Sequence, residues 1–288
     1  MIEGEEEATQ GCAGAPSGHS VNIRHTYDAL IRTWNSLETA RETVSSLRSQ
    51  SLPPLNIIIV DSGSEPSQKA GLVALADKFI DVSDRPFNYS YSINIALPEV
   101  SGSHVLIISS HTRLLDDRVV QEFMQVMDDP SCAAAYLDEV PGAKWQQTKV
   151  TLSNFDSMNG LSNRCALIPM ARLRDRPFRE DVFACEDQVW AKAAFGDGVS
   201  YTMAITTERF HSTVPTRGLL TKWANEQVAL AYYVDSRRMS GRGILWRVTT
   251  GVVFALLLKW DYARIRFWVA YRLIKARRKR PSYESGYL

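Results

Sequence analysis

The chain has 288 residues, of which 45% are hydrophobic, 23% charged and 10% aromatic, with a net charge of +1. This composition is typical of a globular protein and excludes a disordered, collagenous or coiled-coil chain. The charge is unevenly spread: residues 1–22 carry four acidic and no basic side chains, whereas residues 241–280 carry eleven basic side chains and one acidic. We therefore expect a disordered lead over 1–22 and a partner for the basic segment.

The cysteines and the apolar runs of the sequence indicate its cellular location. The four cysteines show no Cys-x-x-Cys spacing, which favours reduced thiols in a cytoplasmic protein. Met1 is followed by acidic sequence in place of a secretory signal. The longest uncharged apolar run, 248–258, has 11 residues, against about 18 or more for a spanning helix. We expect a cytoplasmic protein without a simple transmembrane anchor.

From residue 28 onward, short apolar runs alternate with helical patterns. In chain order, the patterns predict a strand running into a polar loop at 28–35, a helix at 36–50, a strand at 55–60, a helix at 66–79, a strand at 80–82, a helix at 91–98 and a strand at 104–109. Such alternation predicts an α/β fold whose mostly parallel sheet has helices on both faces. From about residue 216 the chain is predicted to be helical.

Ligands of open α/β sheets bind at the carboxyl ends of the strands. The polar residues at those ends, 32–35, 61–64 and 109–113, should therefore converge on one crevice. The glycine motifs of dinucleotide-binding proteins and P-loop NTPases are absent, as is the Gly-x-Ser-x-Gly motif of α/β-hydrolases. These enzyme classes are disfavoured.

Five motifs in fixed order resemble those of family 2 glycosyltransferases, which have the GT-A (Rossmann-like) fold. They are Ile31–Asn35, Ile57–Ser64, Phe87–Asn94, Val105–His111 and Cys185–Trp190. The resemblance covers roughly 28–215 and implies a GT-A catalytic domain over 23–215, which the helical pattern of 216–288 follows as an extension. It further implies a nucleotide-sugar donor, usually a divalent metal ion such as Mg²⁺ or Mn²⁺, and inversion at the anomeric carbon.

The first two motifs match the family's nucleotide-binding loops. Asp61, followed by Gly63, matches a carboxylate that accepts hydrogen bonds from the base or ribose; capping the next turn is its alternative role. The resemblance assigns nucleotide contacts to the loop Arg32, Thr33, Trp34 and Asn35, where Trp34 either stacks on the base or packs beneath the loop. Arg85 either faces the diphosphate or lies on the surface.

The fourth motif departs from the family pattern. Where the family places Asp-x-Asp to hold a metal ion, this chain has Ser109, Ser110 and His111. His111 stands at the position of the second Asp. Together with His211 it would supply two imidazole ligands to a metal ion. Alternatively, His111, Arg113 or Arg85 stabilises the departing diphosphate without a metal ion. The sequence leaves both options open.

The pair Glu186 and Asp187 supplies the catalytic candidates. An inverting transfer needs one carboxylate to take the proton of the acceptor hydroxyl. The resemblance assigns this role to Asp187, with Glu186 shaping the acceptor side. The structural alternative is an acidic pair that merely favours a helix N-terminus.

The C-terminal segment combines basic and aromatic side chains. On a helical projection Arg264, Arg272 and Lys275 lie opposite Ile265 and Leu273, which predicts an amphipathic helix lying on a membrane surface. The alternative is a helical pair packed on the catalytic domain or in an oligomer interface. A nucleic-acid-binding tail is disfavoured because the segment is too apolar.

The sequence therefore predicts a glycosyltransferase, cytoplasmic and peripheral to a membrane, that uses a nucleotide-sugar donor and a lipid-linked or cell-surface glycan acceptor. The rival hypothesis is a catalytically inactive sugar-nucleotide-binding or scaffold protein of the same fold, which the missing Asp-x-Asp motivates.

Overall fold

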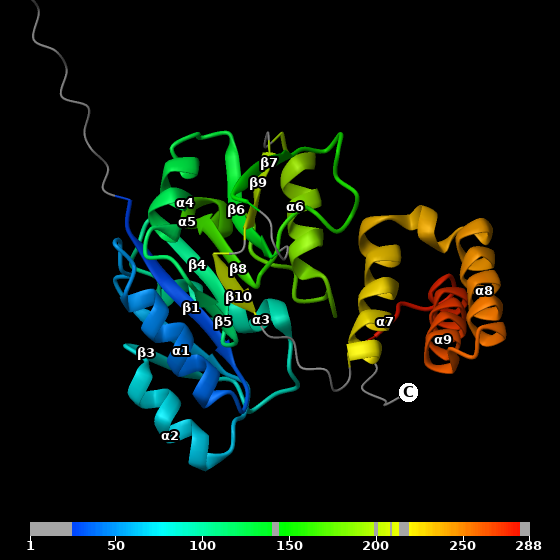
Figure 1. The fold of residues 1–288 in the computed structure, drawn as a ribbon, viewed down its shortest axis with the longest axis horizontal. Helices are drawn as coiled ribbons and strands as arrows, with labels where there is room; N and C mark the ends of the chain where they lie inside the picture. The colour runs from blue at the N-terminus through cyan, green and yellow to red at the C-terminus, as the bar shows by residue number, and fades with distance from the viewer. Residues whose placement is uncertain (1–24, 140–143, 199–200, 208, 213–218, 283–288) are drawn as a thin grey trace, which may run out of the picture.

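The computed structural model describes residues 25–139, 144–198, 201–207, 209–212 and 219–282. The predicted disordered lead, 1–22, lies outside these ranges, as does the end of the chain after 282. In the described ranges an α/β body carries the amino-terminal elements, and a helical extension follows it (Figure 1).

The body is built on one mixed sheet. Eight strands of the described chain pair in the order β3-β2-β1-β4-β8-β6-β9-β7. They are β1 (Tyr27–Thr33), β2 (Ile57–Asp61), β3 (Lys78–Asp81), β4 (His104–Ser109), β6 (Cys132–Glu139), β7 (Gln146–Val150), β8 (Cys165–Pro169) and β9 (Tyr201–Thr207). β3, β2, β1 and β4 run parallel, as predicted, whereas β8 is antiparallel to both β4 and β6. A separate antiparallel pair joins β5 (Thr112–Leu114) to β10 (Phe210–Ser212).

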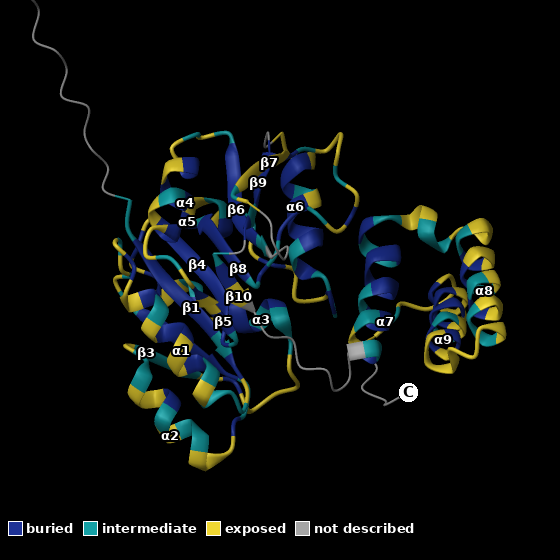
Figure 2. Cartoon of the chain, in the orientation of Figure 1, coloured by how far each residue is buried: buried dark blue, intermediate teal, exposed yellow. Residues whose placement is uncertain are grey.

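Helices cover both faces of the sheet. They are α1 (Leu37–Arg48), α2 (Pro66–Leu75), α3 (Tyr89–Asn94), α4 (Val119–Met127), α5 (Met170–Asp175) and α6 (Glu186–Gly196). Ile31 and Ile59 face the core that contains α1 and α4, whereas Leu30 and Ile58 face the core that contains α3, α5 and α6. Because successive strand residues point to opposite faces, the apolar run of each central strand contributes to both cores. The central strands are coloured as buried in Figure 2.

Several predicted element boundaries differ from those in the structure. The helix predicted over 66–79 ends at Leu75, and residues 78–81 form β3 because they pair in parallel with β2. The helix predicted over 91–98 is α3, which begins at Tyr89 because the Asn88 side chain accepts a hydrogen bond from the Tyr91 N–H at 2.9 Å. Residues 97–99 form a separate 3₁₀ turn.

The extension is a helical layer with its own core. α7 (Leu219–Ala229) continues into a π-helical turn at Leu230–Val234 and a 3₁₀ turn at Ser236–Met239, followed by α8 (Gly241–Leu256) and α9 (Trp260–Ala276). The α7, α8 and α9 side chains pack into one apolar cluster. A second cluster joins Val189 of α6 to Leu230 and Val234. The extension is thereby packed against the body beside α6.

One buried carboxylate ties together the amino ends of three neighbouring strands. Asp28 is fully buried on β1 and accepts hydrogen bonds from Asn56 Nδ2 (2.6 Å), Ser101 N (2.5 Å) and Gly102 N (2.8 Å). Gly102 is needed at this point because a Cβ there would lie 2.7 Å from the Tyr27 backbone. Asp28 therefore aligns β1, β2 and β4, whose opposite ends carry the predicted site.

Replacing Asp28 with Ala should lower the free energy of unfolding by about 3 kcal/mol, because buried donors lose their acceptor. Urea denaturation followed by circular dichroism measures this change. Asp84→Ala, at an exposed carboxylate, is the control and should change stability by less than about 0.5 kcal/mol. Equal stability of the two variants would contradict the aligning role of Asp28.

Candidate active site

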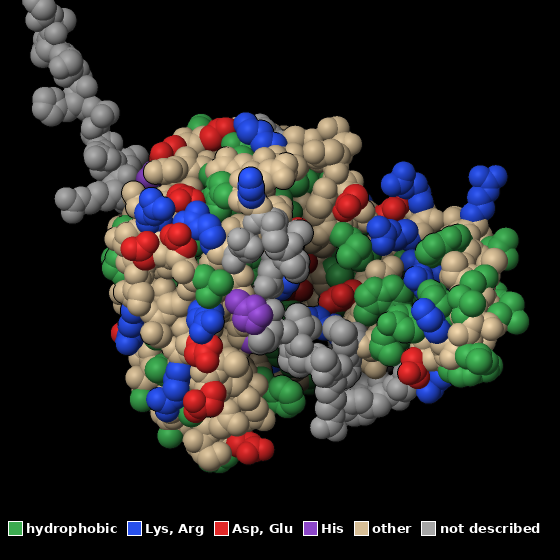
Figure 3. Space-filling view, viewed as in Figure 1, with side chains coloured by type: hydrophobic (Ala, Val, Ile, Leu, Met, Phe, Trp, Pro, Cys, Tyr) green, Lys and Arg blue, Asp and Glu red, His purple; other side chains and the backbone are tan. Residues whose placement is uncertain are grey.

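A cleft of about 1050 Å³ opens where the carboxyl ends of β1 and β4 meet the start of β8. Its walls come from the sheet, from the loop 156–164, from the start of α6 and from the helical extension. In Figure 3, acidic and hydrophobic side chains border the hollow between the body and the extension. Five of the predicted site residues line this cleft: Arg32, Ser109, His111, Glu186 and Asp187.

The acidic pair is positioned by a strained turn. Cys185 precedes α6 with φ of 59°, in the left-handed region that non-glycine residues rarely adopt. The helix then begins directly at Glu186, so both carboxylates belong to its first turn, where the helix dipole favours negative charge. Glu186 is buried, whereas Asp187 keeps part of its surface open to the cleft.

Asn163 and Arg32 hold the acidic pair in place. The Asn163 side-chain amide donates to Glu186 Oε1 at 3.0 Å, and its backbone N–H contacts Asp187 Oδ2 at 3.4 Å. Arg32 Nη1 lies 3.6 Å from Glu186 Oε1, and both side chains are largely buried. Asp187 Oδ1 also accepts the Gln188 N–H at 2.8 Å. Glu186 is thus compensated by a cation, whereas Asp187 has only neutral donors.

This difference perturbs the acidity of Asp187. Desolvation by the surrounding protein, reinforced by the Glu186 charge, raises the pKa of Asp187 to about 7. A carboxylate with a pKa near the operating pH is suited to accept a proton from a hydroxyl group. The geometry and the electrostatics both fit the general-base role that the resemblance assigns to Asp187.

The end of β4 does not match the chemistry of a hard divalent cation. Residues 109–111 contribute two hydroxyls and an imidazole, with no carboxylate. Burial and the charges of Lys222, Arg32 and Arg164 lower the pKa of His111. Among the described residues, no three His, Cys, Asp or Glu side chains are grouped so as to hold a metal ion. The residues present therefore do not fit the metal site that the fold family implies.

The predicted metal ligand His211 lies on β10, outside the lining of the cleft. It is exposed, and its register partner is Arg113 on β5. Arg85 is also outside the lining, where it pairs with Asp84 and stacks on the Tyr91 ring at 4.0 Å from the ring centroid. The metal role of His211 and the diphosphate contact of Arg85 remain predictions.

The two predicted nucleotide loops are hydrogen-bonded to each other around Asp61. This residue is fully buried, and its carboxylate accepts Thr33 Oγ1 at 3.0 Å, Ser64 N at 2.8 Å and Ser64 Oγ at 2.5 Å. Asn35 adds a second link, since its N–H donates to Ser64 Oγ. These contacts correspond to the turn-forming alternative for Asp61, and its nucleotide contact stays a prediction.

The structure also gives the conformation and exposure of Gly63 and Trp34 in these two loops. Gly63 has φ of 98°, a conformation that only glycine adopts without strain, and it donates its N–H to Asp61. Trp34 is 67% exposed, which leaves its ring free to stack on a base and contradicts packing beneath the loop. Thr33, Trp34, Asn35, Asp61 and Gly63 are not among the residues that line the cleft.

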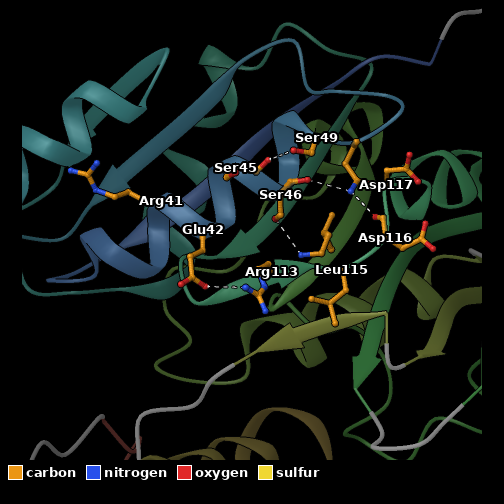
Figure 4. Close-up of a pocket in the computed structure, with 11 residues that line it drawn as sticks. Arg41, Glu42, Ser45, Ser46, Ser49, Arg113, Leu115, Asp116 and Asp117 are labelled. Atoms are coloured by element: carbon orange, nitrogen blue, oxygen red, sulfur yellow. Dashed lines mark hydrogen bonds and ion pairs between the residues drawn. The ribbon is translucent and has the colours of Figure 1, made fainter.

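A second hollow, of about 550 Å³, lies between α1 and the segment 113–117 (Figure 4). Several of its polar groups are already paired: Ser46 Oγ accepts the Leu114 N–H at 3.2 Å, Ser49 donates to the backbone of Ser45, and Arg113 pairs with Glu42. The acidic pair Glu186 and Asp187 lines the first cleft, which is therefore the candidate active site.

Several cleft residues were missed by the sequence reasoning. Asn163 and Arg164 precede an unpredicted antiparallel strand, so nothing in the sequence placed them beside Glu186. Lys222 and Glu226 come from α7, which the sequence places in the helical extension and not in the catalytic domain. The one available signal was their i, i+4 spacing, which is common on solvated helices and therefore uninformative.

Comparison with solved structures shows which fold this is. A mannosyltransferase from Pyrobaculum calidifontis in complex with GDP-Man and Mn²⁺ matches with a TM-score of 0.58 and 15% identity over 91% of this chain and 77% of its own. S. aureus TarS 1-349 in complex with UDP matches with a TM-score of 0.53 and 16% identity over 91% of this chain and 94% of its own. Glucosyl-3-phosphoglycerate synthase from Mycobacterium tuberculosis, with Mn²⁺ and UDP, matches with a TM-score of 0.55 and 12% identity over 72% of this chain and 79% of its own. The predicted GT-A fold is confirmed.

The sequence itself identifies the family. A search of curated proteins returned no match. The family model described as glycosyl transferase family 2 matches residues 28–184, which is more than half of the chain and includes β1, β2, β4 and β8. The chain therefore belongs to glycosyl transferase family 2.

Proposed function

We propose that this glycosyltransferase inverts the anomeric carbon while moving a sugar from a nucleotide-diphosphate donor to a lipid-linked or cell-surface glycan at the cytoplasmic face of a membrane. The observation that carries the proposal is Asp187, a carboxylate with raised pKa at the wall of a large cleft. The bound ligands of the structural neighbours, GDP-Man and UDP, support the donor class.

The proposed reaction is a single displacement in which one residue acts as the general base. Asp187 takes the proton of the acceptor hydroxyl while the acceptor oxygen forms a bond to the anomeric carbon. The bond from that carbon to the diphosphate oxygen breaks, and its electron pair leaves with the diphosphate. Because the acceptor attacks the face opposite the leaving group, one displacement inverts the configuration. Glu186, held by Asn163 and Arg32, fixes the direction of the first helical turn.

The predicted membrane surface needs one correction. Ile265 and Leu273, expected to face lipid, are buried in the core of the extension. Arg272, expected on the exposed basic face, is also buried, and it donates to Asn225 Oδ1 at 2.5 Å. The apolar face of α9 therefore packs on its helical neighbours, as the alternative interpretation expected.

A different apolar surface is exposed on the extension. It follows one side of α8 into the α8–α9 turn, and we call it the α8 patch; its residues are Leu245, Trp246, Val252, Val253, Leu256, Leu257, Leu258 and Trp260. Hydrophobic side chains gather on this part of the molecule in Figure 3. The exposed cations Lys259 and Arg264 adjoin the patch, an arrangement suited to anionic headgroups. Within the described ranges, no helix has the length and apolar character needed to cross a membrane.

The proposed location has a role for the exposed apolar surface. Within the described residues, Cys132, Cys165 and Cys185 form no disulfide. The α8 patch would hold the enzyme on a bilayer whose lipid-linked acceptor can reach the cleft between the body and the extension.

Replacing Asp187 with Asn should lower kcat by about 10²–10⁴-fold, because the amide cannot accept the acceptor proton. The measurement is sugar transfer or donor hydrolysis, after a thermal-shift panel of nucleotide sugars has identified the donor. Glu38→Gln, at an exposed carboxylate outside the cleft lining, is the control and should keep activity within about twofold of the wild type. A loss of less than tenfold in Asp187→Asn would rule out Asp187 as the general base.

The same assay separates the enzyme from the scaffold hypothesis. Wild-type protein that binds the donor without turnover would favour the scaffold hypothesis.

The double variant Leu256→Ser, Leu257→Ser should weaken sedimentation with anionic vesicles at least about tenfold, because each leucine contributes apolar area to the bilayer contact. Leu115→Ser, Leu152→Ser removes two leucines of the body that are also more than half exposed, and should sediment like the wild type. Wild-type protein that stays in the supernatant, or equal sedimentation of both variants, would contradict the membrane proposal.

A further inference from the structure

Three cations from separate parts of the chain surround the end of β4. Arg32 lies on β1, Arg164 directly precedes β8, and Lys222 lies on α7. All three line the same cleft as Ser109 and His111. We call Arg32, Arg164 and Lys222 the cationic cluster. It occupies the region where the family pattern would place two carboxylates.

Arg32 has donors that the protein does not use. Its Nε and Nη1 are buried without a hydrogen-bond acceptor, and its contact with Glu186 at 3.6 Å is longer than a hydrogen bond. Tyr89 supports the guanidinium, which lies 5.3 Å from the ring centroid. Because unsatisfied buried donors are costly, an acceptor with several oxygens at this position would be stabilised.

The other two cations are loosely held. Arg164 Nη2 lies 3.4 Å from Asp138, and Lys222 Nζ lies 3.9 Å from Glu226. Both side chains retain exposed surface, so they can approach an anion in the cleft while keeping their carboxylate partners nearby. Among the carboxylates that line the cleft, Asp138, Glu186 and Glu226 each pair with a cation of the cluster, and Asp156 accepts backbone N–H groups of its own loop.

We propose that the cationic cluster binds the diphosphate of the donor directly, without a divalent metal ion. This inference rests on the proposed function, since it concerns the donor of that same reaction. As the bond to the anomeric carbon breaks, negative charge develops on the departing diphosphate oxygen. Arg32, Arg164 and Lys222 neutralise that charge through charge-assisted hydrogen bonds, beside His111 in the same cleft. Lys222 makes the helical extension part of the donor site.

Equilibrium binding in excess EDTA tests the inference. Isothermal titration calorimetry with UDP, GDP, ADP and dTDP, and with inorganic pyrophosphate as a probe without a base, measures affinity with and without added Mn²⁺. We expect at least one nucleotide, and pyrophosphate, to bind in EDTA. Lys222→Gln should weaken that binding about 10- to 100-fold, the value of a lost charge-assisted hydrogen bond.

Two further variants separate a charge effect from a structural one. Lys222→Arg keeps the charge and should retain binding within about threefold. Lys144→Gln removes an exposed lysine that lines neither hollow and should bind like the wild type. Thermal melting of each variant checks that the fold is unchanged.

The possible outcomes separate this inference from the proposed function. Nucleotide binding that requires Mn²⁺ and is lost in EDTA overturns the inference and leaves the function standing. Pyrophosphate binding in EDTA without binding of any nucleotide supports the anion site and overturns the function. No binding under either condition overturns both. Equal affinity of Lys222→Gln and the wild type would contradict the contribution of Lys222 to diphosphate binding.

Discussion

The chemistry of this protein depends on keeping two adjacent carboxylates enclosed at the start of α6. Withdrawing a charged carboxylate from water costs several kcal/mol unless cations or hydrogen-bond donors compensate it. Glu186 receives that compensation from Arg32 and Asn163, whereas Asp187 receives only neutral donors. Desolvation by the surrounding protein, reinforced by the Glu186 charge, raises the pKa of Asp187. Two carboxylates that are neighbours in sequence are thus suited to different tasks.

The sheet supplies the rigid frame for this arrangement. Arg32 reaches Glu186 because β1 lies beside β4, and Asn163 reaches both carboxylates because β8 starts at the carboxyl end of β4. The extension closes the other side of the cleft through α7 and is joined to α6 by an apolar cluster. The catalytic body and the extension therefore act as one unit at the site, although the sequence divides them by composition and charge.

Sequence patterns were informative where a physical period or a motif was strong. The β-branched runs predicted β2 and β4, and the ordered motifs predicted the fold and the shared location of Arg32, His111 and Asp187. The antiparallel strand β8 was not predicted, because pairing direction depends on chain path, which local pattern does not encode. Asn163 was missed for the same reason, and Lys222 because its spacing on α7 does not show that this helix borders the cleft. The face of α9 was amphipathic as predicted, but periodicity cannot tell whether lipid or protein covers an apolar face.

The most direct test of this account is the ionisation of Asp187 itself. Carbon-13 NMR of the side-chain carboxyls, titrated from pH 4 to pH 9, would follow each group, and the resonance absent from Asp187→Asn identifies Asp187. The account predicts that this resonance titrates near pH 7, so that the base is protonated in acid and ready to accept a proton above neutrality. Titration below about pH 5, in the ordinary range of an aspartate, would contradict it.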